Sequence, residues 1–315
     1  MSEKFFVKQD LFNIIILFIF SFYMFWPFLS GGFIGGTNDL EAHAYSMWYL
    51  KDSILNYGTI PAWTSDHFGG RPFLGIYQPG FYFTIFPLTL LFSSIVMPKI
   101  AFFLAQFIAV FIFYILARYL FKNIWLALIS SLIYSIYPFR INNLGGGSLA
   151  NFFAILYVPL LLLLYEKYKE KASLTKLSLI ALSTGLVFLT HHTTGAITFA
   201  SLLFFIGYDY YFEKRKDLLK IIPFLFIGVI IALFFLIPAF QIKDTLNFEV
   251  QAKSVTNFGY GDYRPLRWFQ FIGLSNKNEE DPSKPLDLKF NKGGAHGEYI
   301  GVLAIILMLF SIIGL

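Results

Sequence analysis

Hydrophobic positions in this 315-residue chain fall into long continuous runs, not into the alternating patterns of a soluble domain. The runs cover about 11–29, 81–97, 100–121, 124–139, 149–165, 177–190, 195–212, 219–240 and 298–315. A helix needs about 20 mainly apolar residues to cross a bilayer. The pattern therefore predicts an all-α polytopic membrane protein.

A more polar stretch, Gly31–Gly80, separates the first two runs and predicts one helix of its own. Asn38 followed by Glu41 three residues later is typical of a helix start, and Gly58 is typical of a helix end. Residues at helical spacing form an apolar stripe: Leu40, Ala44, Met47, Trp48, Ile54 and Leu55. We expect a helix over 39–57 that lies in the membrane interface.

The same helix carries the first candidate site. Asp39 and His43 are four residues apart and therefore neighbours on one face, which also carries Ser46. Glu41 lies two residues from each and points elsewhere. The spacing predicts Asp39 and His43 as site residues and Glu41 as a helix cap.

The segment 81–97 decides the topology, because it is short and contains Pro87. If it stays at the interface and the N-terminus is cytoplasmic, twelve basic residues lie in cytoplasmic loops and four in short outer loops. If it crosses, only four basic residues lie in cytoplasmic loops and twelve lie outside. This contradicts the excess of Lys and Arg expected in cytoplasmic loops. We therefore expect seven spans, outer loops at 30–99 and 241–297, and an eighth span at the C-terminus.

Composition narrows the class further. The chain is 57% hydrophobic, 20% aromatic and only 14% charged, with a mean hydropathy of +0.64, which excludes a soluble domain. The net charge of +5 comes from residues between apolar runs, so we expect no nucleic-acid partner. There is no cysteine, so a metal would need oxygen or imidazole ligands. One membrane domain, 1–315, is expected, truncated at its C-terminus.

A set of short motifs then points to a family. An N-terminal span is followed by Asn38-Asp39-x3-His43, Gly58-Thr59-Ile60-Pro61-x-Trp63 and Tyr77-x-Pro79, and a later span ends in Ala117-Arg118-Tyr119-Leu120-Phe121. This arrangement resembles the GT-C superfamily of glycosyltransferases, which take sugars from polyprenyl-phosphate carriers. It is most similar to the branch called the 6-pyruvoyl-tetrahydropterin-synthase-related membrane domain.

The resemblance implies a GT-C-like bundle and a function. It implies an enzyme of the cell membrane that transfers a hexosyl or pentosyl group from a polyprenyl-phosphate donor to an acceptor glycan, lipid or protein on the outer face, with inversion. Asp39 would be the general base or a metal ligand. The chain lacks the second acidic motif of metal-dependent relatives, so the need for a divalent metal stays open.

Other candidates follow from side-chain chemistry. Imidazole binds metals and phosphate, which favours His191 and His192, and guanidinium binds phosphate bidentately, which favours Arg71 and Arg140. Tyr77 and Arg264 complete the predicted substrate contacts, and a divalent metal would be held by Asp39, His43 and His191. Each has a structural alternative: Asp39 as the favourable anion of a helix's first turn, the histidines as a polar turn, the arginines as headgroup contacts.

Two other functions stay open. A lipid or solute transporter should carry charged residues in the middle of spans and broken helices in paired halves, and the sequence shows neither. A catalytically inactive membrane scaffold of the same fold would keep the same pattern.

Overall fold

The computed structural model describes residues 8–31, 38–64, 71–73, 79–137, 147–241, 274–276 and 288–290. The chain divides into two compact units, one formed by residues 1–135 and 146–242, the other by 136–145 and 243–315. In the second unit, β3 (Leu274–Asn276) pairs with β4 (Leu288–Phe290) in an antiparallel ladder, which the sequence did not predict. The predicted eighth span at 298–315 lies outside the described residues.

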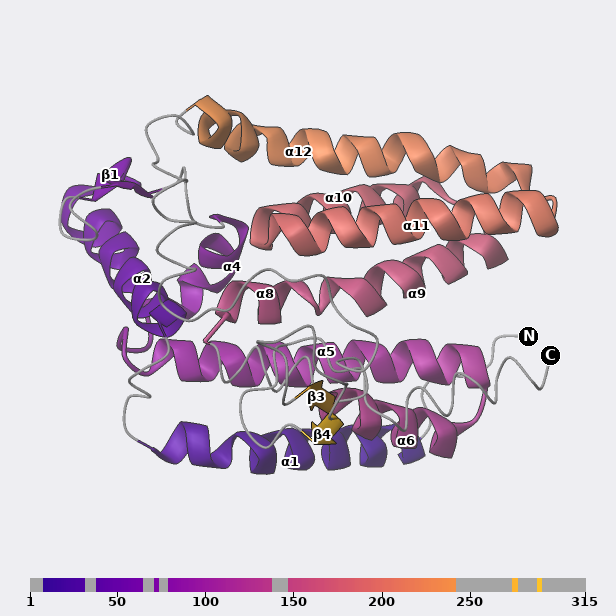
Figure 1. The fold of residues 1–315 in the computed structure, drawn as a ribbon, viewed down its shortest axis with the longest axis horizontal. Coiled ribbons are helices and arrows are strands. Elements are labelled where there is room, and N and C mark those ends of the chain that lie inside the picture. Colours follow the sequence, from indigo (N-terminus) through magenta and orange to yellow (C-terminus); the bar gives the residue numbers. More distant parts are fainter. Residues whose placement is uncertain are drawn as a thin grey trace. The chain divides into compact units, whose positions relative to one another are not determined.

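The first unit is helical, with one small antiparallel ladder (Figure 1). Its elements are α1 (Lys8–Ser30), α2 (Asn38–Tyr57), β1 (Trp63–Thr64), β2 (Arg71–Pro72), α4 (Pro79–Thr89), α5 (Met97–Phe121), α6 (Ile124–Ser135), α8 (Leu149–Ala154), α9 (Tyr157–Glu170), α10 (Leu174–Thr190), α11 (His192–Phe212), the 3-10 turn η1 (Lys216–Lys220) and α12 (Ile221–Gln241). These bounds follow the predicted apolar runs closely.

Five of the described helical segments are long and apolar enough to cross a membrane: Lys8–Ser30, Met97–Phe121, Leu149–Glu170, His192–Phe212 and Lys216–Ile237. Two shorter apolar helices, α6 and α10, run beside them. The expected all-α architecture is confirmed, and the protein is a multi-pass membrane protein.

Burial along α1 shows why a membrane is required. Its buried face repeats every three to four residues and includes the polar residues Asp10, Asn13 and Ser21. Its exposed face is apolar, with Leu11 61%, Ile19 59% and Trp26 53% exposed. A helix that turns polar groups inward and large apolar groups outward suits lipid surroundings and not water.

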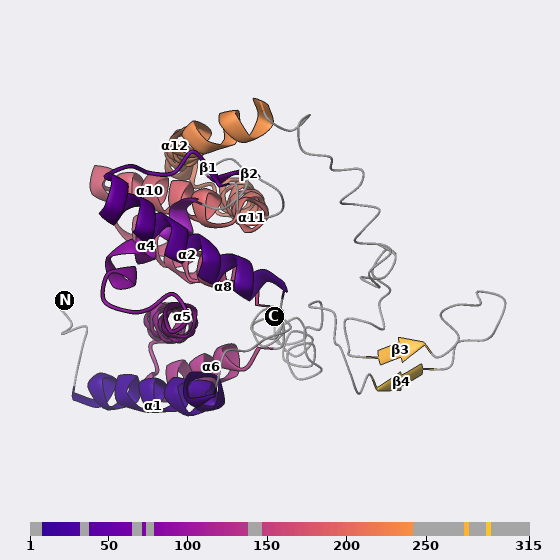
Figure 2. The same ribbon diagram turned by 90° about the vertical axis from the view of Figure 1, so that its left-hand side faces the viewer.

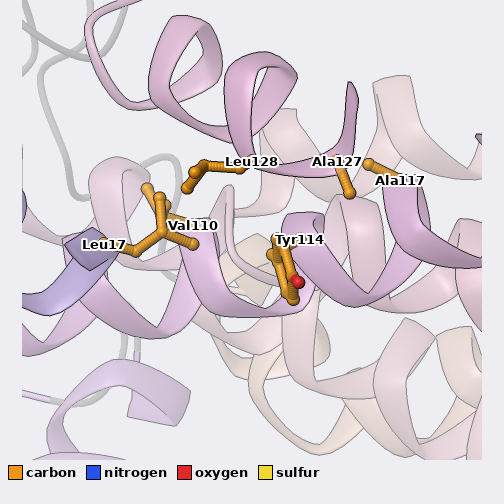
Figure 3. Close-up of a cluster of buried hydrophobic side chains, with 6 residues drawn as sticks. All are labelled: Leu17, Val110, Tyr114, Ala117, Ala127 and Leu128. Carbon is orange, nitrogen blue, oxygen red and sulfur yellow. The ribbon is translucent and has the colours of Figure 1, made fainter. Parts of the chain in front are cut away.

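Side-chain contacts fix the helix directions. The beginning of α1 meets the end of α5, where the Tyr114 hydroxyl donates to Asp10 at 2.7 Å, and the end of α1 meets the beginning of α5 through Phe28 and Phe102. Between these ends, α1, α5 and α6 share an apolar core formed by Leu17, Val110, Tyr114, Ala117, Ala127 and Leu128 (Figure 3). We call the end with Phe28 the site end and the end with Asp10 the opposite end.

The doubtful segment 81–97 does not cross the bundle. It forms only the 11-residue helix α4, which contains Pro87, followed by turns that lead into α5. The Lys99 ammonium donates to the carbonyl of Gly31, so the chain leaves α1 and enters α5 at the same end. The expectation that this segment stays at one end is confirmed.

Ion pairs collect at the opposite end. Arg118 lies 3.3 Å from the fully buried Asp10, and Lys169 lies 2.7 Å from Asp209, which also accepts a hydrogen bond from Tyr165. The Arg215 guanidinium donates to the backbone carbonyl of Lys169. Arg118, Lys169 and Arg215, which the charge count assigns to the cytoplasmic side, therefore lie at the same end of the bundle. Which side of the membrane this end faces stays a prediction.

Candidate functional site

Helix α2 lies at the site end and runs crosswise to α5, α10 and α11 (Figure 2). It begins at Asn38 and ends before Gly58, whose φ of +67° is readily adopted by glycine, as predicted. Half of the apolar stripe is buried in the protein: Leu40, Ala44 and Met47 are 2%, 9% and 1% exposed, because α4, α5 and α8 pack against α2. Trp48 and Leu55 stay exposed.

His43 is enclosed and held in place. It is 3% exposed, and its Nδ1 lies 2.7 Å from the hydroxyl of Tyr82 on α4. Phe81 packs edge-on against the imidazole ring, with the ring centroids 5.5 Å apart. The contact with Tyr82 occupies one ring nitrogen and helps to hold the ring in place. Glu41 is exposed, as expected for a residue on another face.

A second cluster joins three hydroxyl groups from three helices. The Tyr157 hydroxyl on α9 lies close to the side chains of Thr84 on α4 and Thr190 at the end of α10. The Thr84 hydroxyl also donates to the Gly80 carbonyl at 2.6 Å. Tyr157 is 6% exposed and Thr190 is fully buried, whereas Thr84 is exposed. The cluster therefore runs from the surface to the interior.

The third cluster surrounds His191, which caps the N-terminus of α11. Its Nδ1 accepts from the backbone N–H of Thr194 at 3.3 Å and lies 2.8 Å from the Thr194 hydroxyl. That hydroxyl donates to Asn151 Oδ1 at 2.7 Å. His192 stacks on His191, with the ring centroids 5.7 Å apart. The cap role matches the polar-turn alternative for this pair, and leaves Nε2 of His191 for a ligand.

Burial, reinforced by the positive charge that His192 can carry, lowers the pKa of His191 from 6.5 to about 4. His191 is therefore neutral at physiological pH. A neutral imidazole can hydrogen-bond to a phosphate or a sugar but brings no positive charge. His191 could therefore contact a phosphate only through a hydrogen bond.

Several predicted residues lie partly or wholly outside the described structure. Asp39 is the second residue of α2, one helical turn before His43, but its side chain is outside the described residues. The backbone of Arg71 pairs with Thr64 in the β1–β2 ladder, and its side chain is likewise outside. The other predicted contacts, Tyr77, Arg140 and Arg264, lie outside altogether.

The predicted metal ligands can be tested only in part. Among the residues that the structure describes, no group of three or more His, Asp or Glu side chains is placed to hold a metal ion. His43 and His191 both lie at the site end, on helices connected through α4 and α8. Their convergence with Asp39 stays a prediction.

Sequence reasoning missed Tyr82, Thr84, Asn151, Tyr157 and Thr190. Tyrosine and threonine are common in membrane helices, and only their positions relative to one another distinguish these five from the rest. The fold defines the class, a multi-pass membrane protein, and the clusters gather hydrogen-bonding side chains at one end of its bundle. No protein-family model matches the chain, and no curated protein matches it as a relative.

Proposed function

We propose that the protein is a GT-C-like membrane glycosyltransferase with its site at the site end of the bundle, on the outer face of the cell membrane, and with seven spans before its long outer loop. Its substrates would be a polyprenyl-phosphate sugar and an acceptor glycan, lipid or protein. Support comes from α2, which places Asp39 one turn from the buried, Tyr82-bonded His43. The neighbouring hydroxyl, amide and imidazole groups suit a sugar, because they both donate and accept hydrogen bonds.

The mechanism needs one base and one stabilised leaving group. The donor enters sideways from the bilayer, and Asp39 takes the proton of the acceptor hydroxyl. The acceptor oxygen attacks the anomeric carbon, the bond to the phosphate oxygen breaks, and the configuration inverts. General-base help of this kind contributes about 10² to 10⁴ in rate. His43, held by Tyr82, would orient the carboxylate or the acceptor.

The leaving phosphate needs positive charge. Because neutral His191 supplies none, we assign this role to Arg71, Arg140 and Arg264. A divalent metal held by Asp39, His43 and His191 is the alternative source, although the described residues do not themselves form a complete metal site.

Asp39→Asn tests this assignment, with Glu41→Gln as the matched control on the same helix. The asparagine keeps the shape and removes the base, so transfer from a polyprenyl-phosphate hexose should fall by about 10²-fold or more while the protein stays folded. Glu41 is exposed, so its variant should keep near wild-type activity. If Glu41→Gln abolishes transfer and Asp39→Asn does not, the assignment of the base is wrong.

The transporter alternative receives no support from the described helices. Their buried carboxylates, Asp10 and Asp209, lie within the first or last turn of α1 and α11 and are paired with Arg118 and Lys169. A transport site is expected near the middle of spans instead. An inactive scaffold would show no transfer with the wild-type protein under conditions where an active glycosyltransferase works.

A further inference from the structure

The hydroxyl of Thr190 is buried without a hydrogen bond. Thr190 is 0% exposed, and its Oγ1 makes no hydrogen bond of normal geometry to any residue that the structure describes. It nevertheless lies beside the Tyr157 hydroxyl, which also interacts with Thr84. Burying a hydroxyl without a hydrogen bond costs free energy, so such a group in a folded protein needs an explanation.

Comparison with Thr184 shows what is special about this position. Thr184 lies on the same helix, is 1% exposed and also has an unbonded hydroxyl, but it packs against Gly228 of α12. Thr190 instead sits at the end of α10 and is connected through Tyr157 to the exposed Thr84. The cluster therefore leads from the exposed Thr84 through Tyr157 to the buried Thr190.

The close approach of α4 to α10 forms this cluster. Gly80 of α4 packs against Leu189, and a Cβ atom at position 80 would lie 2.5 Å from the Leu189 Cβ, closer than real Cβ contacts come. One helical turn later, Thr84 meets Tyr157, beside the residue that follows Leu189. The glycine thus brings the three hydroxyls together from three helices.

Building on the glycosyltransferase function above, we propose that Thr84, Tyr157 and Thr190 form the subsite for the sugar of the donor. Thr190 hydrogen-bonds a sugar hydroxyl that enters past Thr84, and Tyr157 orients both. Three neutral hydroxyls match a sugar, because each can donate and accept. They do not match the phosphate, which needs charge. The sugar is then placed next to the neutral His191, which follows Thr190 in the chain.

Thr190→Val tests the subsite, because valine keeps the shape of threonine and removes only the hydroxyl. The full chain in lipid nanodiscs is titrated with three probes: a polyprenyl-phosphate hexose, the same polyprenyl phosphate without sugar, and an alkyl hexoside without phosphate. Thr190→Val should weaken binding of both sugar-bearing probes about tenfold, or ~1.4 kcal/mol, and leave binding of the bare polyprenyl phosphate unchanged.

Stability separates a binding role from a structural one. Because the Thr190 hydroxyl is unbonded in the unliganded protein, Thr190→Val should not lower the melting temperature. Thr184→Val is the matched control: it removes the second unbonded hydroxyl of α10 and should leave both stability and sugar binding intact. A lower melting temperature for Thr190→Val with unchanged binding would show a structural hydroxyl and overturn the subsite.

The probes also distinguish failure of the subsite from failure of the proposed function. If the wild-type protein binds the polyprenyl-phosphate hexose and Thr190→Val binds it equally well, the subsite is wrong and the glycosyltransferase proposal stands. If only the alkyl hexoside binds, and Thr190→Val weakens it, the subsite stands and the polyprenyl-phosphate donor is wrong. If neither sugar probe binds, both are overturned. A lipid glycerol headgroup offers similar hydroxyls, so a Thr190→Val effect confined to phosphatidylglycerol would overturn the sugar assignment.

Discussion

Replacing Gly228 with alanine perturbs the packing that holds α10, and with it the site. Helices α10 and α12 form the most extensive helix pair in the described structure. At Gly228 an added Cβ would lie 2.6 Å from both the Ala181 carbonyl oxygen and the Thr184 Cβ. At Gly185, on the facing helix, the nearest atom would lie at 3.1 Å, and at Gly207, in α11, nothing lies within 4 Å.

These three glycines give a graded series with the same chemical change. Each alanine gains about 1 kcal/mol of helix propensity over glycine, so this gain cancels when the variants are compared. What remains is the packing strain, about 1–3 kcal/mol for an extra carbon in a tightly packed core. Gly228→Ala should therefore be less stable than Gly207→Ala by about 1–3 kcal/mol, with Gly185→Ala between them.

The assay is thermal unfolding of the purified variants in one detergent, with ligand binding measured on the same samples. Gly207→Ala should match or exceed the wild-type melting temperature, because its Cβ meets open space. Gly228→Ala should also weaken binding, because a displaced α10 carries Thr190 with it. Equal melting temperatures for Gly228→Ala and Gly207→Ala would refute the close helix approach and the reasoning based on it.

Three further predictions follow from charge. A cysteine introduced at Lys216 should react with a membrane-impermeant probe added on the cytoplasmic side, and a cysteine introduced at Glu41 should react with the probe added outside. The wild-type chain has no cysteine and gives no background labelling. Labelling from the opposite sides would refute the topology. Asp10→Ala removes the partner of Arg118 and should lower the free energy of unfolding by about 3 kcal/mol. Glu170→Ala breaks the exposed pair with Lys167 and should lower it by under about 1 kcal/mol. Similar losses for the two variants would contradict this prediction. The pKa of His191 falls from 6.5 to about 4 on folding, so its contribution to stability is complete above pH 6.5 and lost as the pH falls toward 4. His191→Asn keeps a helix cap without titrating, so its melting temperature should fall less than that of the wild type over this interval, and parallel curves would count against the shift.

The spans could be predicted because apolar length and basic-residue distribution are properties of the sequence alone. Long runs fixed α1, α5, α11 and α12 to within a few residues. Segment 81–97 was the difficult one, since its apolar content equals that of a span. The distribution of basic residues resolved it, and Pro87 within α4 agrees with the short helix observed.

The surroundings of α2 could not be predicted in the same way. An apolar stripe on a helix indicates that one face is buried, but not what buries it. Leu40, Ala44 and Met47 of the stripe pack against the protein, and His43 on the other face is buried as well, because α4 packs against α2. The hydroxyl cluster had no sequence signal either, since Thr84, Tyr157 and Thr190 come together only through the glycine contact of α4 with α10.

The two hydrogen bonds at Nδ1 of His191 constrain how the site can handle charge. If the proton is on Nε2, Nδ1 accepts the backbone N–H of Thr194 at 3.3 Å as the cap of α11, and Nε2–H donates to a ligand. If the proton is on Nδ1, it donates to the Thr194 hydroxyl at 2.8 Å, whose own proton goes to Asn151, and Nε2 accepts a hydrogen bond or coordinates a metal. The tautomer thus decides whether His191 serves as a donor or as an acceptor. Both tautomers are neutral, because burial lowers the pKa of His191 to about 4. In the proposed glycosyltransferase the charge of the phosphate is therefore left to arginine.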